Sequence, residues 1–272
     1  MDRPFHTYDD LKKLMERLRH PETGCPWDLE QTFETIKPHT IEEAYEVADA
    51  IERNDMDDLK DELGDLLFQV VFHSQMAAEQ KIFDLDDVID HVTAKMIFRH
   101  PHVFKDNTNM ATASDVENTI WENQKEKEKK NSGKNTDEGH YLDNVTANLP
   151  SLLYAHKLQK KAYKTGFRYP SFSAVLDKLS EEIDELKQAY ESGNADHINE
   201  EIGDVLLVSS LLATETRNNP EESLRKACHK LKNRFDRVED DLAQSGLTLH
   251  DATIEDMTEA WLRIKDNNRK PL

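Results

Sequence analysis

The amino-acid sequence predicts an all-α protein built from two tandem helical-bundle domains. Only 8 glycines and 9 prolines interrupt the 272 residues, in a chain rich in the helix-favouring residues Leu, Glu, Lys and Ala. Apolar residues recur at the three- and four-residue intervals of a helix. An acidic segment that leads into apolar sequence occurs twice, which indicates a duplicated domain.

Each half is expected to hold about five helices. In the first half, the apolar positions between Ile41 and Ile51 follow the helical period and stop at a turn near Asn54. In the second half, Ser192-Gly193-Asn194 is the equivalent turn. The predicted helices are 6–20, 39–54, 56–80, 84–99 and 114–128, followed by 146–164, 172–192, 195–217, 221–244 and 252–267.

The two halves repeat one another over the length of a domain. Counterparts in the acidic segments lie 139 positions apart, because 181 − 42 and 204 − 65 both equal 139. Glu42, Glu43, Glu46, Glu62, Gly64 and Asp65 correspond to Glu181, Glu182, Glu185, Glu201, Gly203 and Asp204. With small slips in spacing, Lys95, Arg99, Trp121 and Lys125 are echoed by Lys230, Arg234, Trp261 and Lys265.

A segment without apolar periodicity separates the copies. Residues 126–139, EKEKKNSGKNTDEG, pass from a charge run to small polar residues, as linkers do. The predicted domains are therefore 1–130 and 146–272, joined by a linker at 131–145.

The charge balance excludes some classes of partner. The 55 acidic residues outnumber the 35 basic ones, and a formal charge of −20 repels nucleic acids and anionic lipid surfaces. Two cysteines are too few for a disulfide framework. The start of the chain lacks a signal-peptide pattern, and the longest apolar stretches, such as 205–213, are too short to cross a bilayer. We expect a cytoplasmic protein whose partners include neither nucleic acid nor membrane.

The repeated carboxylates predict a metal site. On a helix, Glu43 and Glu46 share a face with Glu42 beside them, and Glu62 and Asp65 form a pair on the next helix. If the two helices pack antiparallel, both sets face one small volume, where crowded carboxylates need a compensating cation. Oxygen-only ligands favour Mg²⁺, with Mn²⁺ as a possible substitute, over Zn²⁺.

Two other interpretations of the acidic faces are weaker. A di-iron bundle site needs Glu-x-x-His pairs, and none of the 12 histidines has a Glu three residues before it. A single acidic helix face is usually solvated surface, but here the same offsets recur in two copies that differ at most other positions. Because Glu62 lies on the shoulder of the apolar stripe, we expect the site at a seam that another helix or a second subunit could complete.

Basic and aromatic residues provide the rest of a phosphate site. Lys230 and Arg234, four residues apart, share a helix face, and both side chains can hold phosphate oxygens. Trp261 with Lys265 suggests a stacking plane beside a cation, although a lone helical Trp is more often a core anchor. The sequence contains no Walker-type glycine loop and no G-x-S-x-G elbow.

The segments CPWDLEQTFETIKPHTIEEAYEVADAI, DELGD and FRHPHVF resemble the MazG family of nucleoside triphosphate pyrophosphohydrolases, over nearly the whole chain. The E-E-x-x-E…E-x-x-D arrangement is that family's metal motif. The resemblance implies bundles of the all-α NTP pyrophosphatase type that dimerise, so that helices of two chains build each site. It also implies Mg²⁺-dependent conversion of nucleoside triphosphates to monophosphate and pyrophosphate.

The resemblance further implies roles for single residues in the second copy, which is generally the catalytic one in two-domain relatives. The implied metal ligands are Glu182, Glu185, Glu201 and Asp204, and the implied nucleotide-binding residues are Lys178, Lys230, Arg234, Trp261 and Lys265. The second possible site, in the first copy, comprises Glu42, Glu43, Glu46, Glu62, Asp65, Lys95, Arg99, Trp121 and Lys125. It departs from the pattern at His39, which stands where the second copy has Lys178 (178 − 139 = 39).

The expected reaction is attack of water in line on the α-phosphorus, with Glu181 or Glu182 accepting its proton. Lys230 and Arg234 would stabilise the departing pyrophosphate. One alternative is a narrower phosphohydrolase of the same fold, acting on phosphoribosyl-ATP or a pyrimidine deoxynucleotide. The other is a non-catalytic acidic scaffold.

Overall fold

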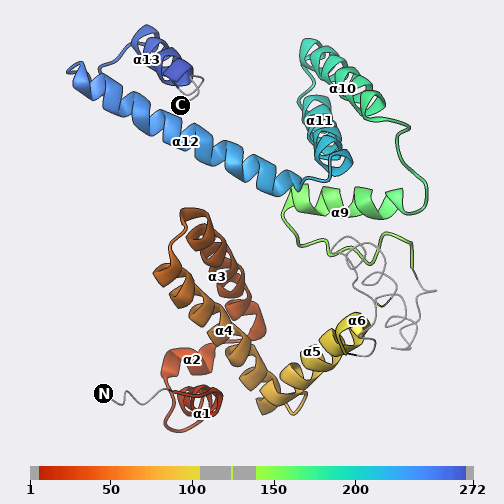
Figure 1. Cartoon of the computed structure of the whole chain (residues 1–272), viewed down its shortest axis with the longest axis vertical. Helices are drawn as coiled ribbons and strands as arrows, with labels where there is room; N and C mark the ends of the chain where they lie inside the picture. The colour runs from red at the N-terminus through yellow and green to blue at the C-terminus, as the bar shows by residue number, and fades with distance from the viewer. Residues whose placement is uncertain (1–5, 105–123, 125–138, 268–272) are drawn as a thin grey trace. The chain divides into compact units, whose positions relative to one another are not determined.

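The computed structural model describes residues 6–104, 124 and 139–267, and in these ranges the chain forms helices and no strand (Figure 1). The prediction of an all-α protein is confirmed. The chain divides into a first unit, Met1–Thr136, and a second unit, Asp137–Leu272. The predicted helix 114–128 and most of the predicted linker 131–145 lie outside the described residues, as do Trp121 and Lys125. The predicted domain boundaries stay a prediction.

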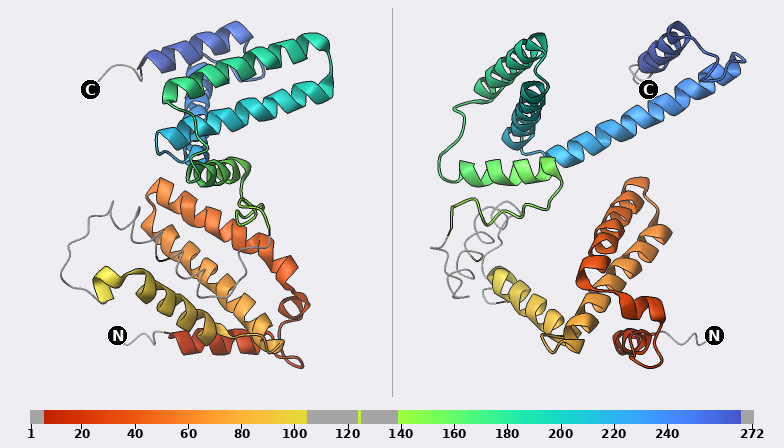
Figure 2. Two further views of the ribbon diagram at one scale, coloured as in Figure 1. Left: turned by 90° about the vertical axis from the view of Figure 1, so that its right-hand side faces the viewer. Right: turned by 180° about the vertical axis from the view of Figure 1, so that it is seen from behind.

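In the first unit, α3 and α4 form a long antiparallel hairpin, called the first hairpin, and α1 and α5 pack against α4 (Figure 2). A single apolar core joins these helices and includes Met15, Phe72 and Leu85. The helices are α1 Tyr8–Leu18, α2 Pro26–Glu30, α3 Phe33–Arg53, α4 Met56–Glu79, α5 Leu85–Arg99 and α6 Pro101–Phe104.

Helix α3 begins at Phe33, six residues before the predicted start at 39. Thr32 caps it, because its side chain accepts from the Thr35 amide while the Thr35 hydroxyl accepts from the Thr32 amide. Pro38 lies inside the helix and removes one backbone donor. The predicted start fell just after this proline, whereas the capping residues lie before it. Helices α2 and α6 were not predicted, since helices of five and four residues show no full apolar period.

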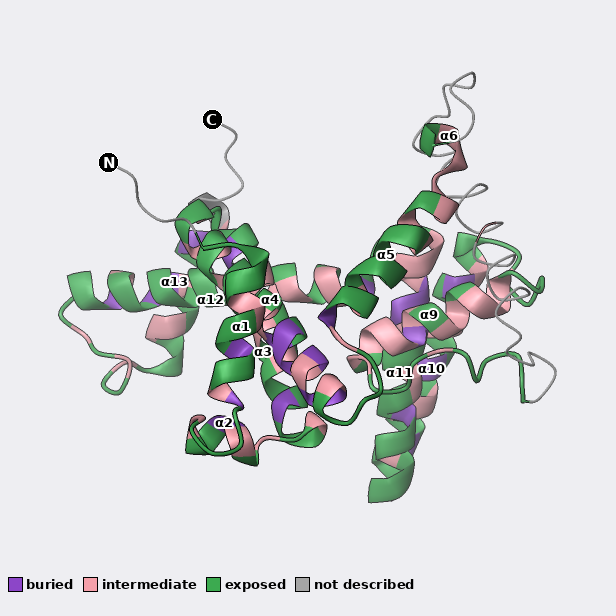
Figure 3. Ribbon diagram, turned by 90° about the horizontal axis from the view of Figure 1, so that it is seen from below, coloured by how far each residue is buried: buried purple, intermediate pink, exposed green. Residues whose placement is uncertain are grey.

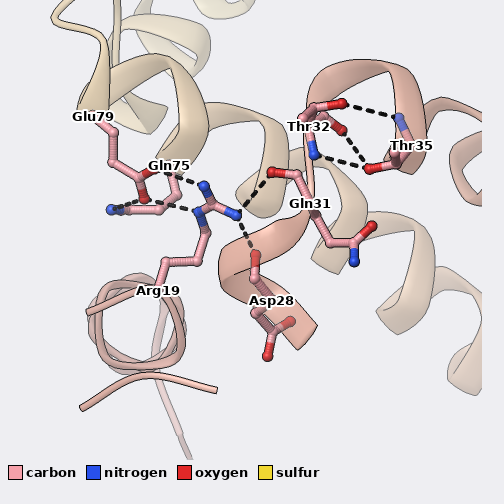
Figure 4. Close-up of polar contacts among 7 residues, drawn as sticks. All are labelled: Arg19, Asp28, Gln31, Thr32, Thr35, Gln75 and Glu79. Atoms are coloured by element: carbon pink, nitrogen blue, oxygen red, sulfur yellow. Dashed lines mark hydrogen bonds and ion pairs between the residues drawn. The ribbon is translucent and has the colours of Figure 1, made fainter. Parts of the chain in front are cut away.

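A buried arginine ties α1 and α2 to α4 (Figure 4). The Arg19 side chain donates to both carboxylate oxygens of Glu79, at 2.9 and 2.8 Å. It also donates to the backbone oxygens of Asp28 and Gln31 at the end of α2. The guanidinium lies 5.3 Å from the centre of the Phe72 ring. Arg19 therefore satisfies the carbonyls that end α2 and covers the core at the same time.

In the second unit, α10 and α11 form the second hairpin, and α9 packs on α11. Helix α12 leads away from the hairpin, and α13 packs on its far half (Figure 2). The hairpin core is built from Val175, Val208 and Leu211, and a separate core joins α12 to α13. The helices are α9 Ser151–Tyr163, α10 Phe172–Ser192, α11 Ala195–Glu215, α12 Pro220–Gln244 and α13 Ile254–Asn267.

The sequence repeat is a repeat of the hairpin backbone. Helices α3 and α10 have the same length of 21 residues and start 139 positions apart, at Phe33 and Phe172. The turn residues that follow, Asn54 and Gly193, are both left-handed, with φ of 56° and 69°. Asn and Gly are the residue types that adopt this conformation at least cost.

Both hairpins leave apolar side chains exposed, and much of their ribbon carries the colours of exposed and intermediate residues in Figure 3. Exposed examples are Leu63 and Leu67 in the first hairpin and Ile202, Leu206 and Tyr190 in the second. Within the described ranges, no helix combines the length and apolarity needed to cross a membrane.

Candidate active site

Helices α10 and α11 bring three carboxylates together, here called the second cluster. Glu182, Glu201 and Asp204 each place one oxygen within 4.8 Å of the others. Glu182 is 6% exposed and Glu201 is 8% exposed. Glu201 Oε1 lies 3.0 Å from His197 Nε2, whereas the buried Oε2 has no hydrogen-bond partner among the described residues. Buried carboxylates this close together call for a compensating cation.

Lys178 stands one turn before the second cluster on α10. Its Nζ lies 2.8 Å from Glu181 Oε1 and 2.9 Å from Glu182 Oε1. Hydrogen bonds first to Glu181 and then to Glu182 raise the pKa of Lys178 above its ordinary value. Lys178 therefore stays charged at the edge of the cluster, where it can meet an anion.

Glu185 adds a fourth carboxylate beside the second cluster. Burial, followed by a hydrogen bond with Glu182, raises the pKa of Glu185. Its oxygens are not among the three that lie within 4.8 Å, but its contact with Glu182 keeps it at the rim. The four carboxylates that the family motif assigns to the metal thus lie on one hairpin.

Helices α3 and α4 build a first cluster from Glu43, Glu46 and Glu62, whose oxygens also lie within 4.8 Å of one another. Burial and then the neighbouring Asp65 raise the pKa of Glu43, and burial and then Glu46 raise the pKa of Glu62. The three carboxylates of the first cluster and Asp65 are half-buried or exposed, so the first cluster is more open than the second.

The side chains around the first cluster differ from those around the second. His39, at the position of Lys178, lies with its Nδ1 3.5 Å from Glu42 Oε2. Gln69, at the position of Val208, donates from Nε2 to Glu43 Oε1 at 3.2 Å. The first cluster thus has the Gln69 amide as a hydrogen-bonding neighbour, whereas the second cluster has the apolar side chain of Val208 at the same position.

A pocket of about 510 Å³ opens beside the second cluster. Lys178, Glu182 and Asp204 line it, so the pocket leads directly into the cluster. Its other walls come from α9, the loop before α10, and α11. These walls include Tyr163, Phe167, Tyr169, Leu207, Val208 and Leu211. We call this cavity the aromatic pocket.

The predicted cations and the tryptophan on α12 and α13 lie outside the lining of the aromatic pocket. The guanidinium of Arg234 on α12 lies 5.9 Å from the centre of the Trp261 ring on α13, and Trp261 packs against the α12–α13 core. None of the residues Lys230, Arg234, Trp261 and Lys265 lines the aromatic pocket. In the first unit, Lys95 and Arg99 lie on α5, which follows the opposite end of α4 from Glu62 (Figure 1).

Sequence reasoning missed several residues at the site. His197 lies four residues before Glu201, a helical spacing that could have indicated the contact. Tyr163, Phe167 and Tyr169 come from a helix end and a loop, which show no apolar period. They could be recognised only once α9, α10 and α11 were placed together.

Comparison with known proteins agrees with this duplicated arrangement. The profile of the MazG nucleotide pyrophosphohydrolase domain matches residues 31–104 and 171–238. The nucleoside triphosphate pyrophosphohydrolase of Escherichia coli K12 is 42% identical over 259 residues, which cover 94% of this chain and 96% of the relative. The nucleoside triphosphate pyrophosphohydrolase/pyrophosphatase MazG of Thermotoga maritima is 38% identical over 260 residues, 95% of each chain.

A crystal structure of a mazG-related protein from Thermotoga maritima overlaps 43% of this chain and 98% of its own, at 29% identity and a TM-score of 0.37. The stronger finding is in the sequences. Each segment that matches the domain profile contains one hairpin with its carboxylate cluster. Together with relatives that match almost end to end, this shows that the chain belongs to the MazG nucleotide pyrophosphohydrolase family.

Proposed function

We propose that the second unit hydrolyses nucleoside triphosphates to nucleoside monophosphate and pyrophosphate with the help of Mg²⁺. The observation that carries this proposal is the buried cluster of Glu182, Glu201 and Asp204, which is continuous with a pocket of about 510 Å³. Relatives that cover nearly the whole chain are named nucleoside triphosphate pyrophosphohydrolases.

The residues present fit a hard divalent ion. Glu182, Glu185, Glu201 and Asp204 offer only oxygen ligands, which suit Mg²⁺ and also Mn²⁺. The unpartnered Oε2 of Glu201 is buried, and such an oxygen is costly unless a cation or donor satisfies it. When bound, the ion supplies positive charge to the triphosphate oxygens and lowers the pKa of an adjacent water.

The chain's own residues hold the phosphates and accept the proton. Lys178 reaches the cluster from its edge and can exchange its carboxylate partners for phosphate oxygens. Water attacks the α-phosphorus in line with the departing pyrophosphate. Glu181 or Glu182 accepts the proton of that water, since both carboxylates lie beside Lys178. Lys230 and Arg234 stabilise charge on the pyrophosphate.

A homodimer would bring those two cations to the carboxylates. Within one chain, neither Lys230 nor Arg234 lines the aromatic pocket, and their helix α12 leads away from the second hairpin (Figure 2). The second hairpin exposes Ile202, Leu206 and Tyr190, and the near half of α12 exposes apolar side chains as well. Exposed apolar stripes on two parts of one unit favour pairing with a second copy.

Mixing two inactive variants tests this dimer. If each site combines the carboxylates of one chain with Arg234 of the other, the variants Glu201→Gln and Arg234→Ala are each inactive alone. After the two variants are remixed, half the dimers are mixed and each mixed dimer has one intact site. The mixture therefore regains about a quarter of wild-type activity. Light scattering gives the oligomeric state. A monomer, or no recovery in proven mixed dimers, refutes the shared site.

The formal charge of −20 supports free nucleotides over nucleic acid as substrates. Both cysteines, Cys25 and Cys228, are free thiols, which fits the reducing cytoplasm.

The test is turnover of individual triphosphates with Mg²⁺ and with EDTA, followed in H₂¹⁸O. Attack at the α-phosphorus places ¹⁸O in the monophosphate, whereas attack at the β-phosphorus places it in pyrophosphate. Turnover of several nucleotides supports the proposal. Turnover of phosphoribosyl-ATP or one pyrimidine deoxynucleotide alone supports the narrow phosphohydrolase, and no turnover supports the acidic scaffold.

A further inference from the structure

The aromatic pocket offers few polar groups that could read the edge of a nucleobase. Gln159 is its one amide, and all of that amide is used within the protein. Nε2 donates to the Leu207 oxygen and to Ser210 Oγ, both at 2.8 Å. Oε1 accepts from Ser210 Oγ at 3.1 Å and from Thr214 Oγ1 at 3.2 Å.

Among the other polar groups of the pocket, the Tyr163 hydroxyl is buried beside Glu215 and has no hydrogen-bond partner among the described residues. Burial and then the neighbouring carboxylate of Glu215 raise the pKa of Tyr163. Lys178 is paired with Glu181 and Glu182. Arg168 is exposed. The walls that remain are aromatic rings and aliphatic side chains, and such walls bind flat rings through stacking and apolar contact.

The first unit carries larger side chains at the hairpin positions that line the aromatic pocket in the second unit. Leu207, Val208 and Leu211 correspond to Phe68, Gln69 and Phe72, each 139 positions earlier (208 − 69 = 139). Phe72 is 1% exposed in the core, and the Phe68 and Phe72 rings lie 6.1 Å apart. Gln69 is 8% exposed and bonds to Glu43. Gln69 therefore contacts the first cluster directly, and Phe68 and Phe72 pack in the core of the first unit.

Trp261, which the sequence suggested as a stacking plane, is already engaged. Its ring lies under Arg234 and against the α12–α13 core. Phe167 is different, because it is 80% exposed and yet lines the pocket. A ring that exposed contributes little to folding and is free to cover a ligand.

We propose that the aromatic pocket holds the base of the nucleotide by stacking and apolar contact, with Phe167 as its cover, and that Phe68, Gln69 and Phe72 deny the first unit such a pocket. This inference rests on the proposed function of the second cluster. Each chain then binds one nucleotide, with its phosphates at Lys178 and the carboxylates. An inorganic triphosphate, which has no base, reaches the cluster without using the pocket.

The experiment compares two ligands on full-length protein with Mg²⁺: a non-hydrolysable nucleoside triphosphate analogue and inorganic tripolyphosphate. Phe167→Ala is expected to lower the affinity for the analogue about 10-fold or more, as loss of one base-stacking ring does. The affinity for tripolyphosphate should change by less than about twofold. Tyr141→Ala is the matched control, because Tyr141 is an exposed ring of the same unit outside the pocket, 52% exposed. Tyr141→Ala should change the affinity for neither ligand.

A second variant copies the first unit into the second. Val208→Gln should weaken binding of the analogue by a similar factor, and the melting temperature is checked separately. Analogues of all four bases should lose affinity by similar factors, because stacking tolerates any base. Loss for one base alone, equal loss for tripolyphosphate, or no loss in Phe167→Ala overturns the inference. Absence of Mg²⁺-dependent turnover in the wild-type protein would instead refute the proposed function.

Discussion

The two hairpins share a backbone and differ in what surrounds their carboxylates. Both have a 21-residue first helix, a left-handed turn residue and three carboxylates within 4.8 Å. The second hairpin has Lys178 and Val208 where the first has His39 and Gln69. A duplicated backbone therefore fixes the spacing of the acidic groups, whereas the side chains beside them differ between the two hairpins.

Burial differs in the same direction. Glu182 and Glu201 are buried, whereas the three carboxylates of the first cluster are half-buried or exposed. An ion held by buried carboxylates interacts more strongly with a triphosphate, because less water screens the charges. The comparison therefore favours the proposal that turnover takes place in the second unit.

The largest expected effect separates the two clusters directly. Glu201→Gln removes a buried ligand oxygen and should lower kcat/KM for a nucleoside triphosphate by about 1,000-fold or more. Glu62→Gln, its counterpart in the first unit (201 − 139 = 62), should change kcat/KM less than about twofold. Steady-state kinetics on both variants give the answer, and equal losses would remove the distinction between the units.

The next effect concerns stability in the first unit alone. Arg19→Met leaves the Asp28 and Gln31 carbonyls and the Glu79 carboxylate without their donor, and should cost about 2–3 kcal/mol of unfolding free energy. This figure is discounted because the Glu79 side chain is 35% exposed. Denaturant unfolding measures it, and turnover by the second unit should persist. Arg53→Ala, which removes exposed ion pairs, should cost about 0–1 kcal/mol and serves as control.

The stabilisation by Arg19 should depend on pH. Burial alone would raise the pKa of Glu79, but hydrogen bonds from Arg19 and then Gln75 lower it below 4.5. A carboxyl whose pKa is lower in the folded state contributes stability above its unfolded pKa and loses it as pH falls through the folded pKa. The difference between wild type and Arg19→Met should therefore shrink below about pH 4.5. A difference that stays constant into strong acid would contradict this account.

Exchanging the cation at the edge of the cluster should have an intermediate effect on catalysis. Lys178→His copies the first unit, and at pH 8 it replaces a charged ammonium by a largely neutral imidazole. We expect kcat/KM to fall about 10- to 100-fold, as for loss of one charge-assisted phosphate contact. Unchanged kinetics at pH 8 would show that Lys178 holds no phosphate. His39→Lys in the first unit should not alter turnover.

The smallest expected effect lies in the hairpin turns. Gly193 has φ of 69° with open space where a Cβ would stand, so Gly193→Ala meets only backbone strain. It should cost about 1–2 kcal/mol, and Gly193→Asn, which copies Asn54, should cost less than Gly193→Ala. Thermal unfolding distinguishes the two variants, and equal costs would show that the turns are not equivalent.

The fold and the carboxylates could be predicted because each depends on local spacing. Glu182 and Glu201 lie on adjacent helices of one hairpin, and helical geometry with a short turn is enough to bring them together. The start of α3 lies at the Thr32–Thr35 cap, before Pro38, whereas the predicted start at 39 lies after this proline. The aromatic pocket could not be predicted, since Tyr163, Phe167 and Val208 meet only through the packing of three segments. The position of Arg234 depends on how α12 packs on α9 and α13, and the apolar period of a helix does not fix its packing partners.

The central claim is that one cluster in each chain, the second, holds a nucleotide with its metal ion. Calorimetric titration with a non-hydrolysable nucleoside triphosphate analogue and Mg²⁺ tests it most directly, on the wild type, Glu201→Gln and Glu62→Gln. The account predicts one analogue per chain in the wild type, none in Glu201→Gln and one in Glu62→Gln. Two analogues per wild-type chain, or loss of binding in Glu62→Gln alone, would contradict it.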